Sequence, residues 1–156
     1  FFFAFFLFQG LLAWLFALPA WVVASDASSA LSIWVILGVV FWLVSLAGES
    51  LADRQLDVFR TNPDNKGKVC KVGLWRYSRH PNYFFEWLHW FAYPLIALGA
   101  PYHWITWFGP VLMFAFLYRV TGIPYTEKQS LKSRGEAYRE YQRTTSAFLP
   151  WPPKDT

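Results

Sequence analysis

The stretch FFFAFFLFQGLLAWLFALPAWVVA, residues 1–24, contains no charged side chain. A helix that crosses a membrane needs about 20 consecutive apolar residues, within a range of about 17 to 25, and this stretch meets that requirement. It lacks the basic leader and the small-residue cleavage site of a secretory signal, and it is longer than the apolar part of such a signal. Residues 1–24 therefore predict a membrane helix.

Three further apolar stretches follow, at residues 30–51, 83–100 and 104–120. The last two are close to the minimum length for a span and are expected to form a hairpin. The chain is 55% hydrophobic and only 15% charged, against about 25% charged in a typical soluble domain, and no alternating pattern indicates strands. We therefore predict an all-α fold, an integral membrane helical bundle of about four transmembrane helices, in a single membrane domain over residues 1–156.

The fourteen lysines and arginines are confined to two regions, seven at residues 54–79 and seven at residues 119–154. The connections at 25–30 and 99–104 contain none, although 25–30 offers Ser and Asp as helix caps. If every span crosses the membrane once, both basic regions fall on the same side. Such segregation is typical of membrane proteins, because loops rich in Lys and Arg stay in the cytoplasm.

This charge pattern assigns an orientation to the chain. We expect a multi-pass protein of a bacterial inner membrane, with a cytoplasmic cofactor loop at residues 52–82 and a cytoplasmic tail at residues 121–156. The net charge of +4 is concentrated where it would contact membrane lipids, so no nucleic-acid partner is predicted.

The first residue is Phe1 and the only methionine is Met113. We therefore expect the chain to be the C-terminal part of a longer protein, whose upstream transmembrane helices would be its partners. Cys70 is the only cysteine, so neither an intrachain disulfide nor a Cys-based metal site is possible. With its carboxylates scattered, the sequence predicts no metal site.

After the fourth apolar stretch the sequence becomes polar, and residues 121–156 form the tail. Pro124 is suited to the first turn of a helix, whereas Gly135 interrupts the pattern, so one helix or two shorter helices are both consistent with the sequence. A common face holds Glu127, Leu131, Arg134, Tyr138 and Tyr141. The tail is expected to lie along the cytoplasmic membrane surface and to cover the loop, with its tyrosines and tryptophans near the interface.

The second apolar stretch continues as LADRQLDVFR, residues 51–60, without a proline. A helix can therefore run to about Arg60, with Glu49, Asp53 and Arg60 along one face. Ionisable groups near membrane depth usually face a protein interior or a water-filled cavity, and they are functional candidates. The alternative, a helix that simply emerges into water, stays open for the residues further along.

The stretch GLWRYSRHPNYFFEW, residues 73–87, places polar side chains at the entrance to the third apolar stretch. Pro81 presets a helix start, and the free N–H groups of that start make an electropositive end. Arg76 and Arg79 add positive charge beside it. This combination suits a phosphate-bearing ligand or lipid head groups.

Asn82, Glu86, His89 and Tyr93 follow at spacings of four, three and four residues, and they predict one polar stripe on the third helix. Exposing such a stripe to lipid would cost several kcal/mol per unsatisfied group. The stripe must therefore face other helices, water or a ligand. Hydrogen bonding between helices without any ligand remains an open alternative.

These motifs resemble the C-terminal domain of the steroid 5-alpha-reductase family, in particular its bacterial members of unassigned substrate. GLWRYSRHPNYFFEW, the tail GIPYTEKQSLKSRGEAYREYQRTTSAFLPW (122–151) and the upstream LADRQLDVFR carry the resemblance. It extends from about Gln9 to Lys154. The Arg-His-Pro core is also similar to that of isoprenylcysteine and phospholipid methyltransferases. In those, a paired acidic element precedes the tail, and here it is reduced to Glu127-Lys128.

The resemblance implies an NADPH site formed by the loop and the adjacent helix ends. Asp53 and Arg60 would hold the adenosine and phosphate portion. The pyrophosphate, ribose or carboxamide would fall to Arg79, Asn82, Tyr83 and Glu86, with Arg76 adding charge at the rim. Arg134 matches the basic tail element of the reductases only loosely. The implied reaction is hydride transfer to an activated C=C bond of a lipid-soluble, steroid-like or enone substrate.

The catalytic residues are not identified by the sequence. His89 and Tyr93 are candidates near the chemistry, but the resemblance implies that upstream helices supply the tyrosine and glutamate that polarise the carbonyl. Two alternatives remain open. One is a membrane methyltransferase of isoprenylcysteine or phospholipid type that uses S-adenosylmethionine, and the other is a non-catalytic membrane protein.

Overall fold

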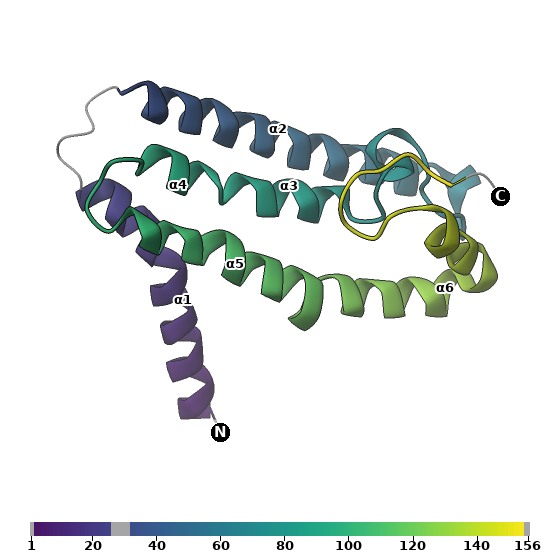
Figure 1. Ribbon diagram of the computed structural model, residues 1–156. Coiled ribbons are helices and arrows are strands. Elements are labelled where there is room, and N and C mark those ends of the chain that lie inside the picture. Colours follow the sequence, from purple (N-terminus) through teal and green to yellow (C-terminus); the bar gives the residue numbers. More distant parts are fainter. Residues whose placement is uncertain (1, 26–31, 155–156) are drawn as a thin grey trace. The chain divides into compact units, whose positions relative to one another are not determined.

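The computed structural model describes residues 2–25 and 32–154 (Figure 1). The helices are α1 (Phe2–Ser25), α2 (Ile33–Thr61), α3 (Pro81–His89), α4 (Ala92–Ile96), α5 (Phe108–Ala115) and α6 (Ile123–Thr144). Short 3₁₀ turns cover Pro63–Asn65, Gly73–Arg76 and His103–Trp107, and a π-helical turn covers Phe116–Val120. No strand occurs in the described ranges, which confirms the all-α prediction. Apart from Ser25, the predicted caps at 25–30 lie outside the described residues.

Within the described ranges, three stretches are long and apolar enough to cross a membrane: α1, α2 and the stretch His103–Thr144. The last one joins the apolar α5 to the polar α6, which carries eight charged side chains. Since charged side chains are costly in hydrocarbon, we place its membrane-spanning part before α6. These features fit an integral membrane helical bundle.

The third apolar stretch, predicted as one span over residues 83–100, is not a single helix. α3 ends at His89 after nine residues, and α4 has only five residues, from Ala92 to Ile96. The cause is Pro94, which lacks an N–H and whose ring collides with the carbonyl four residues earlier, at Trp90. The prediction of an unbroken stripe is therefore wrong, because Tyr93 belongs to a different helix from Asn82.

The chain divides into two compact units. Unit 1 comprises residues 1–43 and 88–114, and unit 2 comprises residues 44–87 and 115–156. All fourteen lysines and arginines belong to unit 2. Unit 1 is thus the apolar unit and unit 2 the basic one.

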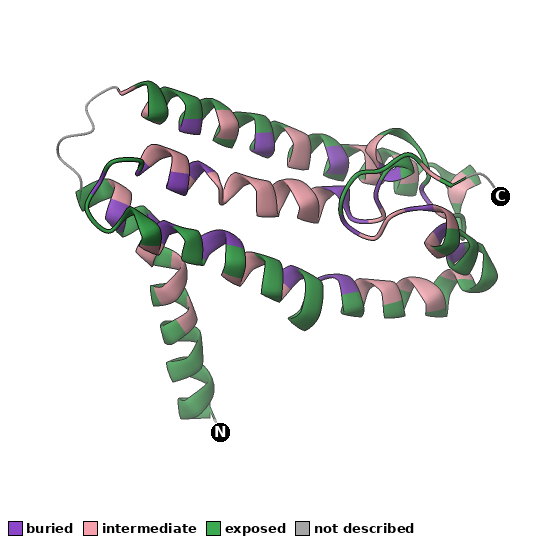
Figure 2. Ribbon diagram, viewed as in Figure 1, coloured by how far each residue is buried: buried purple, intermediate pink, exposed green. Residues whose placement is uncertain are grey.

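Unit 1 is built from small and apolar side chains. Its buried core contains Val22, Ala97 and Ala100, against which Ile105 packs. Most of α1 is exposed, as the green ribbon in Figure 2 shows. An exposed helix that is apolar all round is suited to lipid or to further helices rather than to water.

Unit 2 is held together by contacts between the loop, α2 and the tail. The indole Nε1 of Trp75 donates to the carbonyl of Ala52 at 2.8 Å, and the Ser78 hydroxyl donates to the carbonyl of Phe148 at 2.8 Å. Tyr141 donates from its hydroxyl to the carbonyl of Trp75. The tail therefore covers the loop, as the sequence predicted.

Close packing within unit 2 gives a first prediction. A methyl group added at Gly48 would lie 2.5 Å from ring atoms of Phe85, so Gly48→Ala should destabilise the protein by about 1–3 kcal/mol through overpacking. Gly10→Ala is the matched control, because nothing lies within 4 Å of that position. Melting temperatures of the detergent-solubilised variants check this, and equal values for both variants would contradict the close approach of α2 and α3.

Candidate functional site

Unit 2 contains a cavity of about 310 Å³, at the lower end of the range of roughly 300–1,000 Å³ for small-molecule sites. The C-terminal part of α2, the loop, the start of α3 and α6 all line it. Charged, amide, hydroxyl and aromatic side chains meet there. Such a mixture is typical of a site that orients a polar ligand.

Helical spacing brings these side chains to the cavity. α2 contributes Asp53 and Arg60, two turns apart on one face. α6 contributes Thr126, Ser130 and Arg134 at intervals of four residues, followed by Tyr138 and Tyr141. Within α6 the backbone is non-helical at Gly135, where φ is 53° and ψ is −125°. The predicted start at Pro124 and the predicted interruption at Gly135 are both confirmed.

The structure brings five of the predicted cofactor residues together. They are Asp53, Arg60, Arg79, Asn82 and Tyr83, and the loosely matched Arg134 joins them. Arg76 and Glu86 do not line the cavity. His89 and Tyr93 belong to unit 1, apart from the unit that contains the cavity.

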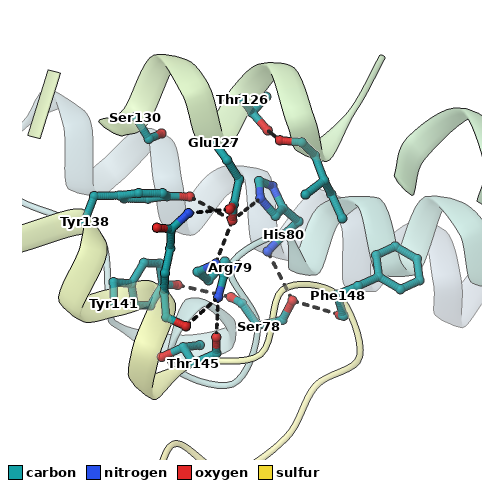
Figure 3. Close-up of polar contacts among 12 residues, drawn as sticks. Ser78, Arg79, His80, Thr126, Glu127, Ser130, Tyr138, Tyr141, Thr145 and Phe148 are labelled. Atoms are coloured by element: carbon teal, nitrogen blue, oxygen red, sulfur yellow. Dashed lines mark hydrogen bonds and ion pairs between the residues drawn. The ribbon is translucent and has the colours of Figure 1, made fainter. Parts of the chain in front are cut away.

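An ion pair beside the cavity joins Arg79 to Glu127 (Figure 3). The Nε of Arg79 lies 2.6 Å from Oε1 of Glu127, with the two side chains 10% and 14% exposed. The Nη1 of Arg79 donates to the carbonyls of Gln142 at 3.0 Å and Thr145 at 2.6 Å. Three of the five N–H donors of an arginine are thus occupied, so Arg79 holds the wall of the cavity instead of presenting a free guanidinium.

Glu127 has further donors around it. Nε2 of His80 lies 3.3 Å from its Oε1, and Nε2 of Gln142 donates to its Oε2 at 2.5 Å. The His80 ring stacks on Tyr83, with centroids 5.4 Å apart and planes 5° from parallel. Glu127 therefore fixes the Arg-His pair that precedes α3 and, through His80, the ring of Tyr83.

These contacts set the acidity of Glu127. Burial alone would raise its pKa, but the hydrogen bonds from His80 and Arg79, together with the charge of Arg79, lower the pKa from 4.5 to about 2. Burial also raises the pKa of Tyr138 to about 12 and the pKa values of Tyr141 and Cys70 above their ordinary ranges. These three groups stay protonated at neutral pH and add no negative charge to the cavity.

Asn82 and Asp53 form a second polar pair. The Nδ2 of Asn82 donates to Oδ1 of Asp53 at 3.0 Å. The Oδ1 of Asn82 is buried and has no hydrogen-bond partner within the described part of the chain. A buried acceptor without a partner costs free energy, so this atom is suited to a ligand that carries an N–H or O–H group.

Two arginines of the cavity have no carboxylate partner among the residues that the structure describes. Arg60 is exposed and makes no hydrogen bond or ion pair with residues 2–25 or 32–154. Arg134 donates to the carbonyl of Lys68 at 2.9 Å and lies near the hydroxyls of Ser130 and Ser133. Guanidinium groups without a carboxylate partner are suited to phosphate. The residues present therefore fit a phosphate-bearing cofactor that also has an amide or hydroxyl donor.

Sequence reasoning did not identify the role of Glu127, nor the contributions of His80, Cys70, Trp75, Thr126 and Ser130 to the site. The repeat of small hydroxyl residues at intervals of four on α6 was the available signal. No group of three or more metal-ligating side chains occurs in the described ranges.

In the comparison with known proteins, residues 1–145 match the model of the family described as "Protein of unknown function (DUF1295)". This family is related to steroid 5-alpha-reductase-like proteins in general. Searches of curated proteins and of solved structures gave no match.

The buried ion pair gives a second prediction. Glu127→Gln removes the charge opposite Arg79 and should lower the stability by about 3–5 kcal/mol, the usual cost of breaking a buried pair. The control is Glu136→Gln, whose side chain is 67% exposed in its contact with Arg139, and it should change stability little. Melting temperatures of both variants at pH 7 check this. If Glu127→Gln matched the control, the pair would not hold the site together.

A third prediction concerns pH. Because the pKa of Glu127 is lower in the folded state, the unfolded chain takes up the proton first on acidification. The stabilisation by this group is present above pH 4.5 and is lost as the pH falls toward about 2. Relative to wild type, the melting temperature of Glu127→Gln should therefore depend less on pH between these values. Parallel curves for the two proteins would contradict the lowered pKa.

Proposed function

We propose, from the premise that this chain belongs to the DUF1295 family, that it is the cofactor-binding part of a membrane-embedded reductase that uses NADPH. The observation that carries the proposal is the composition of one cavity. Arg60 and Arg134 have no carboxylate partner there, and the Oδ1 of Asn82 is buried without a hydrogen-bond partner in the described part of the chain. When bound, NADPH would supply a hydride for an activated C=C bond of a lipid-soluble substrate.

The charged and the neutral side chains of the cavity suit different parts of NADPH. Arg60 and Arg134 would hold phosphate oxygens, because a guanidinium offers paired N–H donors to them. Asn82 can accept a hydrogen bond from a carboxamide, and Asp53 can accept one from a ribose hydroxyl. Tyr83, stacked on His80, would provide an aromatic surface beside them.

Arg79 has a different role from the one that the family resemblance implied. Three of its donors are bound to Glu127, Gln142 and Thr145, so it would orient the site rather than bind phosphate through those groups. Arg76 and Glu86, which do not line the cavity, are not part of the proposed set.

The apolar unit 1 suits a lipid-soluble substrate, and His89 and Tyr93 belong to it. In this proposal the group that polarises the substrate carbonyl comes from helices upstream in the same protein. The basic unit 2 would face the cytoplasm, where NADPH is found, and this orientation agrees with the preference of Lys and Arg for the cytoplasmic side.

The main alternative is a methyltransferase that uses S-adenosylmethionine. One observation favours it: Glu127, the remaining acid of the methyltransferase element, contacts Arg79 and His80 of the Arg-His-Pro core that both classes share. S-adenosylmethionine, however, has no phosphate, and its single carboxylate could pair with one of Arg60 and Arg134 but not with both.

A titration of the detergent-purified, full-length protein tests the proposal and is the fourth prediction. NADPH should bind and S-adenosylmethionine should not, as measured by calorimetry. Arg60→Gln and Arg134→Gln should each weaken NADPH binding by about tenfold or more, because a hydrogen bond to a charged group contributes about 1.5–3 kcal/mol. Asn82→Ala should also weaken binding, through loss of the amide contact.

Arg76→Gln is the matched control, since it removes one positive charge outside the cavity. If it weakened binding as much as Arg60→Gln does, the effect would be general electrostatics and the site would be misplaced. Binding of S-adenosylmethionine alone would favour the methyltransferase, and binding of neither cofactor would favour a non-catalytic membrane protein.

A further inference from the structure

A second cavity of about 500 Å³ lies on another face of α2 in unit 2. Leu51, Gln55, Val58 and Asn62 follow one another along it at intervals of four, three and four residues. Phe59 is the only residue that also lines the first cavity. The two cavities thus use different faces of the same helix.

The surface of this second cavity is mainly apolar and open to the outside. Leu51 is 48% exposed, Val58 61% and Val72 52%. Leu51 is the last residue of the apolar stretch at 30–51, and charged residues follow along α2 from Asp53 onward. The cavity therefore begins where the helix passes from apolar to polar sequence, which is the level of lipid head groups.

The polar side chains of this cavity include one positive charge and no negative charge within the described residues. Three amide side chains already accept or donate hydrogen bonds inside the unit: Gln55 accepts from Leu74, Asn62 accepts from Asp64, and Asn65 donates to Phe59. Arg54 is exposed and has no hydrogen bond or ion pair with residues 2–25 or 32–154. It is the charged group left for an outside partner.

We propose that this second cavity binds an anionic phospholipid. Its acyl chain would cover Leu51, Val58 and Val72, and its phosphate would bind the guanidinium of Arg54. A lipid satisfies both requirements at once, because it brings an apolar chain and an anionic head group to the same boundary. The other lysines and arginines of unit 2 further attract an anionic membrane surface.

The occupant is a lipid rather than a small anion or another protein segment. A single exposed arginine is a weak site for free phosphate in water, since exposed charges are screened by salt. A helix of another protein would cover the apolar side chains but would need a carboxylate placed opposite Arg54, whereas an anionic lipid always brings its charge to that boundary. This inference does not depend on the reductase proposal, because the second cavity shares only Phe59 with the first one.

Native mass spectrometry of the full-length protein in a neutral detergent tests the inference. The probes are dioleoylphosphatidylglycerol, dioleoylphosphatidylcholine with the same chains, and glycerol 3-phosphate without chains. The anionic lipid should be retained about fivefold more strongly than the zwitterionic one, the contribution of one basic residue near an anionic surface. Glycerol 3-phosphate should not be retained.

Arg54→Gln should abolish the preference for the anionic lipid, whereas Arg54→Lys should keep most of it. Val58→Asp should weaken both lipids. Arg139→Gln is the charge-matched control, because its side chain is 68% exposed beside Glu136 and outside this cavity. Unchanged melting temperatures verify that the variants are folded.

Four results would overturn the inference. They are equal retention of the two lipids, an unchanged preference in Arg54→Gln, retention of glycerol 3-phosphate as strong as that of the lipid, and no retained lipid in the wild type. The last result is expected if another protein segment covers the cavity.

Discussion

The ion pair between Arg79 and Glu127 is the contact on which the architecture of unit 2 depends. Each charge is almost removed from water, with 10% and 14% of the side chains exposed, and the opposite charge offsets much of the free-energy cost of that burial. The pair joins the loop just before α3 to α6, and its two residues are 48 positions apart in the sequence. This contact therefore joins two segments whose neighbouring residues line the cavity.

Helices whose limits are set by neighbouring residues in the sequence, such as a proline, a glycine or the end of an apolar run, were predictable. Pro81 and Pro124 open helices, Gly135 interrupts one, and the long apolar runs form α1 and α2. The break in the third apolar stretch was also present in the sequence, as Pro94, but hydrophobicity alone does not distinguish one helix from two. The hydrophobicity of a stretch does not show that Pro94 lacks the N–H group that a continuous helix needs.

The residues of the site were only partly predictable. Periodicity places Asp53 and Arg60 on one face of α2, and it places Thr126, Ser130 and Arg134 on one face of α6. It does not specify which of these faces meet, because that depends on packing between segments distant in sequence. The pairing of Arg79 with Glu127 is of this kind, and it occupies part of a guanidinium that the sequence alone offers to phosphate.

The backbone conformation of Gly135 has a consequence for the shape of the first cavity. Residues on both sides of it, Arg134 before and Tyr138 after, line the same space. The stretch after Gly135 is fastened to the loop through Tyr141, whereas the stretch before it continues from the membrane segment. Because a positive φ such as the 53° of Gly135 is a conformation that glycine adopts most readily, this one residue sets the angle between the two stretches of α6 and, with it, the spacing of the side chains that they bring to the cavity.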